Sequence, residues 1–123
     1  VGSEMCIRDR ISRRRVMEDI ETLLMQIISY SGDCKSSCIE ALDLFKEEDY
    51  SQANSKLESA YNSLLKAKKI HAKLLSESVD SSTMQISLFL VHAEDQMMSA
   101  ETIITLVRKF LEIIKKKEGK SND

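Results

Sequence analysis

The chain has 123 residues and a formal net charge of −2, with no proline, no tryptophan and three glycines. This length allows one domain. A hydrophobic share of 42% is too high for a disordered chain, and the scarcity of proline and glycine argues against an all-β sandwich or barrel. The near-neutral charge removes most support for nucleic-acid binding, and no apolar run approaches the about 20 residues of a membrane span. Without a signal-peptide core either, the sequence predicts a soluble, mostly helical protein.

Residues 1–10 are predicted to be a translated sequencing adapter rather than part of the protein. The segment VGSEMCIRD back-translates to GTG GGC TCG GAG ATG TGT ATA AGA GAC AG, which has the form of a transposase adapter read in frame. We therefore exclude these residues from the fold prediction and expect them to be disordered. With Cys6 excluded, Cys34 and Cys38 are the cysteines to be explained.

The first predicted helix covers about residues 13–47. Its apolar positions recur at steps of three and four, as on one face of an α-helix. These positions are Val16, Ile20, Leu23, Ile27, Ser31, Cys34, Cys38, Leu42 and Phe45. Gly32 interrupts them without shifting their phase, so we expect a kink or a close helix contact there. Cys34 and Cys38 are predicted to be small core residues in a reducing compartment, because a disulfide or zinc site lacks supporting ligands.

The second predicted helix covers about residues 50–76. Asp49 and Gln52 have the spacing of a capping box, which starts a helix. An apolar face follows at helical spacing, with His71 on it as a structural residue. After this helix, residues 76–82 are rich in serine and acidic side chains, a composition that is typical of a mobile loop.

The third predicted helix covers about residues 84–117 and carries two apolar stripes. In its first residues Met84, Ile86, Leu88 and Leu90 alternate with Gln85, Ser87, Phe89 and Val91, and taken alone this segment also fits a short strand. One stripe suits packing on the other two helices: Leu90, Ala93, Met97, Ala100 and Ile104. The other is spaced like a coiled-coil seam: Met84, Leu88, Val91, Asp95, Met98 and Thr102. Because a three-helix bundle has one interior, we expect the second stripe to meet other copies of the chain.

Asp95 is the candidate metal ligand of this seam. An unpaired carboxylate among apolar side chains is costly, so it should be paired, protonated or bound to a cation. Around a symmetry axis each copy brings one carboxylate to the same level, where three acids repel unless a hard divalent cation takes their oxygens. A polar residue that only sets the register, with ordered water, is the open alternative.

His92 is the candidate nucleophile. It precedes Asp95 by three positions and Gln96 by four, so the three side chains lie on neighbouring parts of one helix face. A neutral imidazole beside an interface suits nucleophilic work, although spacing alone equally allows a structural histidine. The sequence has no glycine-rich phosphate loop, no metal-binding CxxC and no HExxH motif. It therefore gives no support for the enzyme classes that these motifs indicate.

Three segments resemble one known family, the lactose/cellobiose-specific enzyme IIA proteins of the bacterial sugar phosphotransferase system. SLFLVHAEDQMMSA at 87–100 resembles the LLVHAQDHLMTA signature of that family. IISYSGDCKSSCIEAL at 27–42 is similar to its IIxxAGDARSxxxEAL segment, and KEEDYSQA at 46–53 to its KEGDFEEA turn. The three segments keep the family's order and spacing, and the resemblance covers about residues 17–116.

The resemblance implies an all-α fold, an antiparallel three-helix bundle within residues 11–120 that assembles as a homotrimer, followed by a tail at 121–123. It implies a cytoplasmic phosphocarrier in which His92 accepts a phosphoryl group from the carrier HPr, on Nε2 as in the family. His92 would pass the group to a cysteine of enzyme IIB, for uptake of a lactose-, cellobiose- or chitobiose-type sugar. Asp95 would match the aspartate whose three copies hold one Mg²⁺ per trimer.

The chain departs from the family pattern at several positions. The second histidine of HAQDH is Gln96 here, and its glutamine is Glu94, a negative charge two residues from His92 that we expect to raise the pKa of His92. In the EAHKIQT segment, Lys68 and His71 stand where histidine and glutamine are usual, and the turn glycine is Glu48. Two other functions stay open from the residues. They are a histidine phosphotransfer domain, which typically has lysine and glycine after its histidine, and a non-catalytic helical assembly module.

Overall fold

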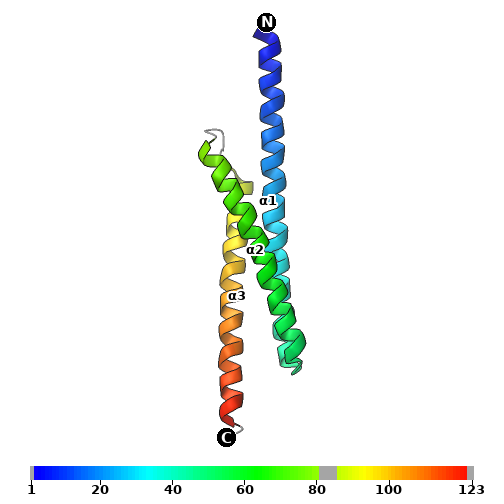
Figure 1. The fold of residues 1–123 in the computed structure, drawn as a ribbon, viewed down its shortest axis with the longest axis vertical. Helices are drawn as coiled ribbons and strands as arrows, with labels where there is room; N and C mark the ends of the chain where they lie inside the picture. The colour runs from blue at the N-terminus through cyan, green and yellow to red at the C-terminus, as the bar shows by residue number, and fades with distance from the viewer. Residues whose placement is uncertain (1, 81–85, 122–123) are drawn as a thin grey trace.

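The computed structural model describes residues 2–80 and 86–121, which form three α-helices. They are α1 (Gly2–Lys46), α2 (Tyr50–Asp80) and α3 (Leu88–Ser121). α2 runs antiparallel to α1, and α3 runs in the same direction as α1, so the two chain ends lie at opposite ends of an elongated molecule (Figure 1). The predicted all-α fold is confirmed for these residues, and within them no helix is long and apolar enough to cross a membrane.

The hydrophobic core follows α1, which packs against both of the other helices, while α2 and α3 contact each other less extensively. Small side chains let the helices approach closely: Cys34, Cys38, Ala41, Ala53, Ala60, Ala67, Ala93 and Ala100 are fully buried. Larger apolar side chains fill the space between them: Leu24, Ile27, Phe45, Leu64, Leu74, Met97, Ile104, Val107 and Leu111. Burial of each such large side chain contributes about 1.5–3 kcal/mol, so the apolar stripes hold the helices together.

The turn between α1 and α2 has a defined cap on each side. The Asp49 Oδ1 atom accepts a hydrogen bond of 3.3 Å from the backbone N–H of Gln52, so the predicted N-cap is confirmed. On the α1 side, the N–H of Asp49 donates to the carbonyl of Leu44 and the N–H of Glu48 to that of Phe45. This Schellman pattern requires a left-handed residue, and Glu48 supplies it with φ of 64°.

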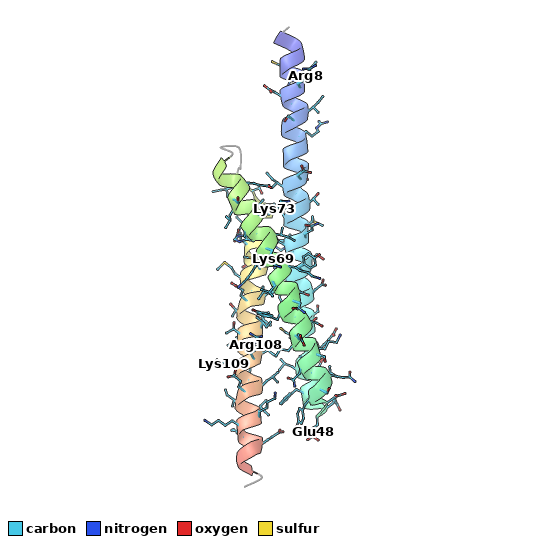
Figure 2. All side chains as sticks on the ribbon, viewed as in Figure 1. Arg8, Glu48, Lys69, Lys73, Arg108 and Lys109 are labelled. Atoms are coloured by element: carbon cyan, nitrogen blue, oxygen red, sulfur yellow. The ribbon has the colours of Figure 1, made fainter. Side chains whose placement is uncertain are left out.

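The structure corrects the predicted start of α1 and the predicted end of α2. Residues 2–10 were expected to be disordered but continue α1, which extends past the ends of the other helices; Arg8 lies on this extension (Figure 2). The run 3–31 has no proline or glycine to stop a helix growing from the packed part of α1. The adapter origin of residues 1–10 stays a prediction. Residues 76–80, expected in a mobile loop, extend α2, and 81–82 lie outside the described residues.

α3 begins later than predicted, at Leu88 rather than at residue 84. The Ser87 hydroxyl accepts a hydrogen bond from the N–H of Leu90, and the Ser87 carbonyl one from the N–H of Val91, so Ser87 is the N-cap. Residues 88–91 are therefore helical, whereas 84–85 lie outside the described residues. The helix ends with Ser121, beyond the predicted 117, and the rest of the predicted tail, 122–123, is not described.

Two predictions about the interior of α1 have different outcomes. The helix passes through Gly32 without interruption, and a Cβ atom at Gly32 would meet nothing within 4 Å. Of the two predicted alternatives, the close helix contact is therefore wrong, and the kink stays a prediction. Cys34 and Cys38 are buried and free, as predicted. A hydrogen bond to Cys34 and burial hold the pKa of the Cys38 thiol far above its usual range, so this thiol stays protonated.

Candidate functional site

His92 lies in the second turn of α3 with an exposed side chain. The serine cap at residue 87 sets where the helix starts, and the buried Ala93 next to His92 sets which way the helix is turned. Within the described parts of the chain, the His92 ring has no hydrogen-bond or ion-pair partner. The ring of an exposed residue without such partners is free to react, as a nucleophile that meets another protein requires.

The helical rotation places three side chains in a fixed order around α3. Successive residues are turned by about 100°, so Asp95 and Gln96 flank His92 on opposite sides. Asp95 is exposed, Gln96 is half-buried, and the buried face follows with Ala93 and Met97. The predicted neighbourhood of His92, Asp95 and Gln96 is thus present, with His92 at the boundary between the core side and the exposed side.

Lys35 of α1 is a fourth residue of this site, which the sequence analysis did not identify. Its Nζ atom donates a hydrogen bond to the Oε1 atom of Gln96, and both side chains are half-buried. The contact joins α1 to the turn of α3 that follows His92. The sequence did contain a signal for Lys35. In the segment 27–42, which resembles the family, Lys35 stands where the family segment has an arginine.

Glu94 lies on the other flank of α3 and does not face His92. Its carboxylate contacts Nε2 of His71 on α2, with side-chain exposures of 35% for Glu94 and 19% for His71. Residues two positions apart on a helix point in nearly opposite directions. The contact partner of Glu94 is therefore His71 and not His92, and the expected effect of Glu94 on His92 stays a prediction.

Asp95 lies in an exposed apolar stripe of α3. The neighbouring side chains of the stripe are 86% exposed for Leu88, 51% for Val91 and 60% for Met98. Further along the same helix, Leu106, Phe110 and Ile113 are also more than half exposed. Asp95 has no hydrogen bond or ion pair within residues 2–80 and 86–121. In that part of a single chain no group of three or more His, Cys, Asp and Glu could hold a metal ion.

An open groove of about 510 Å³ lies between α2 and α3, beside the exposed stripe. Leu64 and Ile104 form part of its apolar lining, and Leu106 and Thr102 line its edge toward the exposed stripe. Lys68 and Glu101 span the groove as an ion pair, which explains why a lysine is accommodated at position 68. The guanidinium of Arg108 lies 4.7 Å from the ring centroid of Tyr61 in the same groove, and Figure 2 shows Arg108 on the lower half of α3.

The chemistry available at this site is narrow. An exposed neutral imidazole can attack an electrophile, the amide of Gln96 can accept or donate hydrogen bonds, and the Lys35 ammonium can attract an anion. The unpartnered Asp95 carboxylate can bind a cation. Phosphoryl transfer needs only an in-line nucleophile and stabilisation of charge on the equatorial oxygens, so a site this small is sufficient for it.

Comparisons with known proteins point to one family. Residues 22–115 match the family model described as PTS system, Lactose/Cellobiose specific IIA subunit. A lichenan-specific phosphotransferase enzyme IIA component of Bacillus subtilis strain 168 is 30% identical over 99 residues, which cover 80% of this chain and 90% of that protein.

Two solved structures are similar to the chain in both sequence and fold. The crystal structure of PtcA from S. mutans has a TM-score of 0.75 at 33% identity, covering 80% of this chain and 96% of that one. The crystal structure of the PTS cellobiose-specific enzyme IIA from Bacillus anthracis has a TM-score of 0.76 at 29% identity, covering 82% and 93%.

Proposed function

The chain belongs to the lactose/cellobiose-specific IIA family of the sugar phosphotransferase system, and from this premise we propose that it carries a phosphoryl group on His92. The observation that carries the proposal is the exposed, unpartnered His92 ring within the segment 87–100 that resembles the family's signature. His71, the other histidine of the chain, is half-buried and bound to Glu94, so it is the weaker nucleophile.

The proposed reaction consists of two displacements at phosphorus. In the first, the lone pair of a neutral His92 ring nitrogen attacks the phosphorus atom of phospho-HPr. The bond from phosphorus to the donor breaks, and the donor group keeps the electron pair. In the second, a cysteine thiolate of enzyme IIB attacks the same phosphorus, and the nitrogen–phosphorus bond of His92 breaks with its electron pair returning to the ring. The phosphoryl group is thus relayed without any other covalent intermediate on this chain.

The same proposal includes an assembly, a homotrimer of antiparallel three-helix bundles with α3 at the threefold axis. The support is the exposed apolar stripe of α3, which is too extensive for a surface that stays in water. Three Asp95 carboxylates would then meet at one level of the axis, where one Mg²⁺ ion fits their oxygen ligands and offsets their mutual repulsion. In this role the cation holds the trimer together and takes no part in phosphoryl transfer.

The proposed partners and place of action follow from the same role. HPr donates the phosphoryl group and enzyme IIB accepts it. Both partners bind to the exposed side of α3 in the cytoplasm. The transported sugar is of the lactose, cellobiose or chitobiose type, and it meets the membrane component rather than this chain.

The proposal is tested by incubating the full chain with phosphorylated HPr and measuring acid-labile phosphate on the protein. We expect phosphate on the wild type, none on His92→Ala, and wild-type labelling on His71→Gln, the matched variant of the other histidine. Labelled His92→Ala would overturn the assignment of His92. An unlabelled wild type would overturn the phosphocarrier role and favour a non-catalytic assembly module.

A further inference from the structure

Lys35 brings a positive charge from α1 to the part of α3 that contains His92. Its ammonium group is held by the Oε1 atom of Gln96, and the side chain is half-buried between the two helices. A lysine that is free in solvent samples many rotamers, whereas this contact restricts the ammonium to one region. The contact makes Lys35 a fixed charge rather than a solvated one.

Gln96 directs this charge toward His92. The two residues are one helical turn apart, so their Cβ atoms are about 5–6 Å from each other. Side chains on an α-helix lean toward its N-terminus, and the Gln96 amide therefore leans toward the turn that carries His92. A phosphoryl group on His92 would extend the ring by a further bond and three oxygens, which brings an anion into the range of the Lys35 ammonium.

The charges around His92 make a cation at this place useful. A phosphoryl group brings about −1.5 to −2 charges at neutral pH. Several other basic side chains are engaged elsewhere: Lys56 contacts Glu40, Lys68 contacts Glu101, and Arg108 lies over Tyr61. The contact with Gln96 attaches the Lys35 ammonium to the His92 side of α3.

We propose that the Lys35 ammonium binds the phosphoryl group carried by His92, and that Gln96 positions Lys35 for this contact. This inference rests on the proposed function, because it requires that His92 accept phosphate. Lys35 makes no bond to phosphorus and exchanges no proton in either displacement. Its effect is electrostatic, since it stabilises negative charge on the phosphoryl oxygens during transfer and in the phosphorylated protein.

The test compares Lys35→Met, which keeps the length of the side chain and removes its charge, with Lys35→Arg, which keeps the charge. Lys46→Met is the matched control, because Lys46 is exposed on the same helix about 16 Å further along its axis. The rate of phosphate transfer from phospho-HPr is measured for the full chain. We expect about a tenfold loss for Lys35→Met, less than for an enclosed oxyanion-hole donor because Lys35 is half-exposed. Lys35→Arg and Lys46→Met should stay near the wild-type rate.

A second readout separates phosphate binding from a structural role. In a ³¹P NMR titration of the phosphorylated proteins, loss of a nearby cation disfavours the dianion, so the phosphoryl pKa of Lys35→Met should rise by about half a unit. Gln96→Ala should shift it in the same direction by less. A slower Lys35→Met with an unchanged ³¹P titration overturns the inference, as does a shift in Lys46→Met of the same size. A wild type that accepts no phosphate overturns the proposed function instead.

Discussion

The imidazole of His71 on α2 contacts the carboxylate of Glu94 on α3, and both residues stand at positions where the resembling family segments have glutamine. The two departures are therefore one feature, because the two positions face each other across the helix interface. The family segments have two neutral amides at these positions, whereas this chain has an imidazole and a carboxylate that contact each other. His92, two residues from Glu94, lies on a different face and is not part of this pair.

The coupling between His71 and Glu94 is measurable in a double-mutant cycle with His71→Gln, Glu94→Gln and the double variant. Because the pair is partly exposed, we expect a coupling free energy of about 0.5–1 kcal/mol at neutral pH, with the double variant more stable than the sum of the single changes predicts. Urea unfolding followed by circular dichroism gives the four free energies. Additive single effects would show that the contact contributes nothing.

Glu48→Gly should stabilise the protein. Glu48 has φ of 64° at the end of α1, in the left-handed region where a side chain is strained and glycine is not. Figure 2 shows Glu48 at the turn between α1 and α2. Relief of about 1–2 kcal/mol of backbone strain is offset in part by the greater freedom of glycine in the unfolded chain, so we expect a net gain of about 0.5–1 kcal/mol. The measurement is thermal and urea unfolding.

The matched control for this change is Glu58→Gly, at an exposed position inside α2. There glycine relieves no strain and only adds freedom to the unfolded chain, so a loss of about 1 kcal/mol is expected. If Glu48→Gly also lowered the free energy of unfolding, the left-handed conformation would not be a source of strain.

The sequence predicted the features of the fold that depend on periodicity and on local hydrogen bonding. The apolar spacing indicated three helices, and the pair Asp49 and Gln52 indicated the start of α2. The helix ends were predicted less well, because they depend on which caps form. Ser87 was one of several serines near the start of α3, and nothing local distinguishes the one whose hydroxyl is positioned to cap.

The candidate site shows the same division between local and long-range information. His92, Asp95 and Gln96 share a helix, so their proximity follows from spacing alone. Lys35 and Gln96 are 61 residues apart in the chain, and His71 and Glu94 are 23 apart. Contacts of this kind depend on how the helices pack, which one sequence does not determine residue by residue. The exposure of the α3 stripe agrees with the expected seam, whereas its occupant stays a proposal.

Gly32→Ala should stabilise α1. Glycine in a helix interior costs about 0.5–1 kcal/mol relative to alanine, and here a Cβ atom would meet nothing within 4 Å. We therefore expect the free energy of unfolding to rise by about that amount in urea titrations at a fixed protein concentration. A loss of stability would show that another chain packs on Gly32 in the assembled protein, and the change would then depend on protein concentration.

Asp95→Leu should make the assembly independent of divalent cations. In the proposed trimer the three Asp95 carboxylates repel one another unless a cation binds them, so the wild type should have three times the 14.0 kDa of one chain in Mg²⁺ and a lower mass after chelation. Leucine at this position continues the apolar stripe, and Asp95→Leu should keep the trimer mass in both conditions. Asp43→Leu, at an exposed position of α1, adds the same side chain and should keep the wild-type dependence. Light scattering coupled to size-exclusion chromatography measures the masses of the wild type and the two variants. A monomeric wild type in Mg²⁺ would contradict the model of an axial cation.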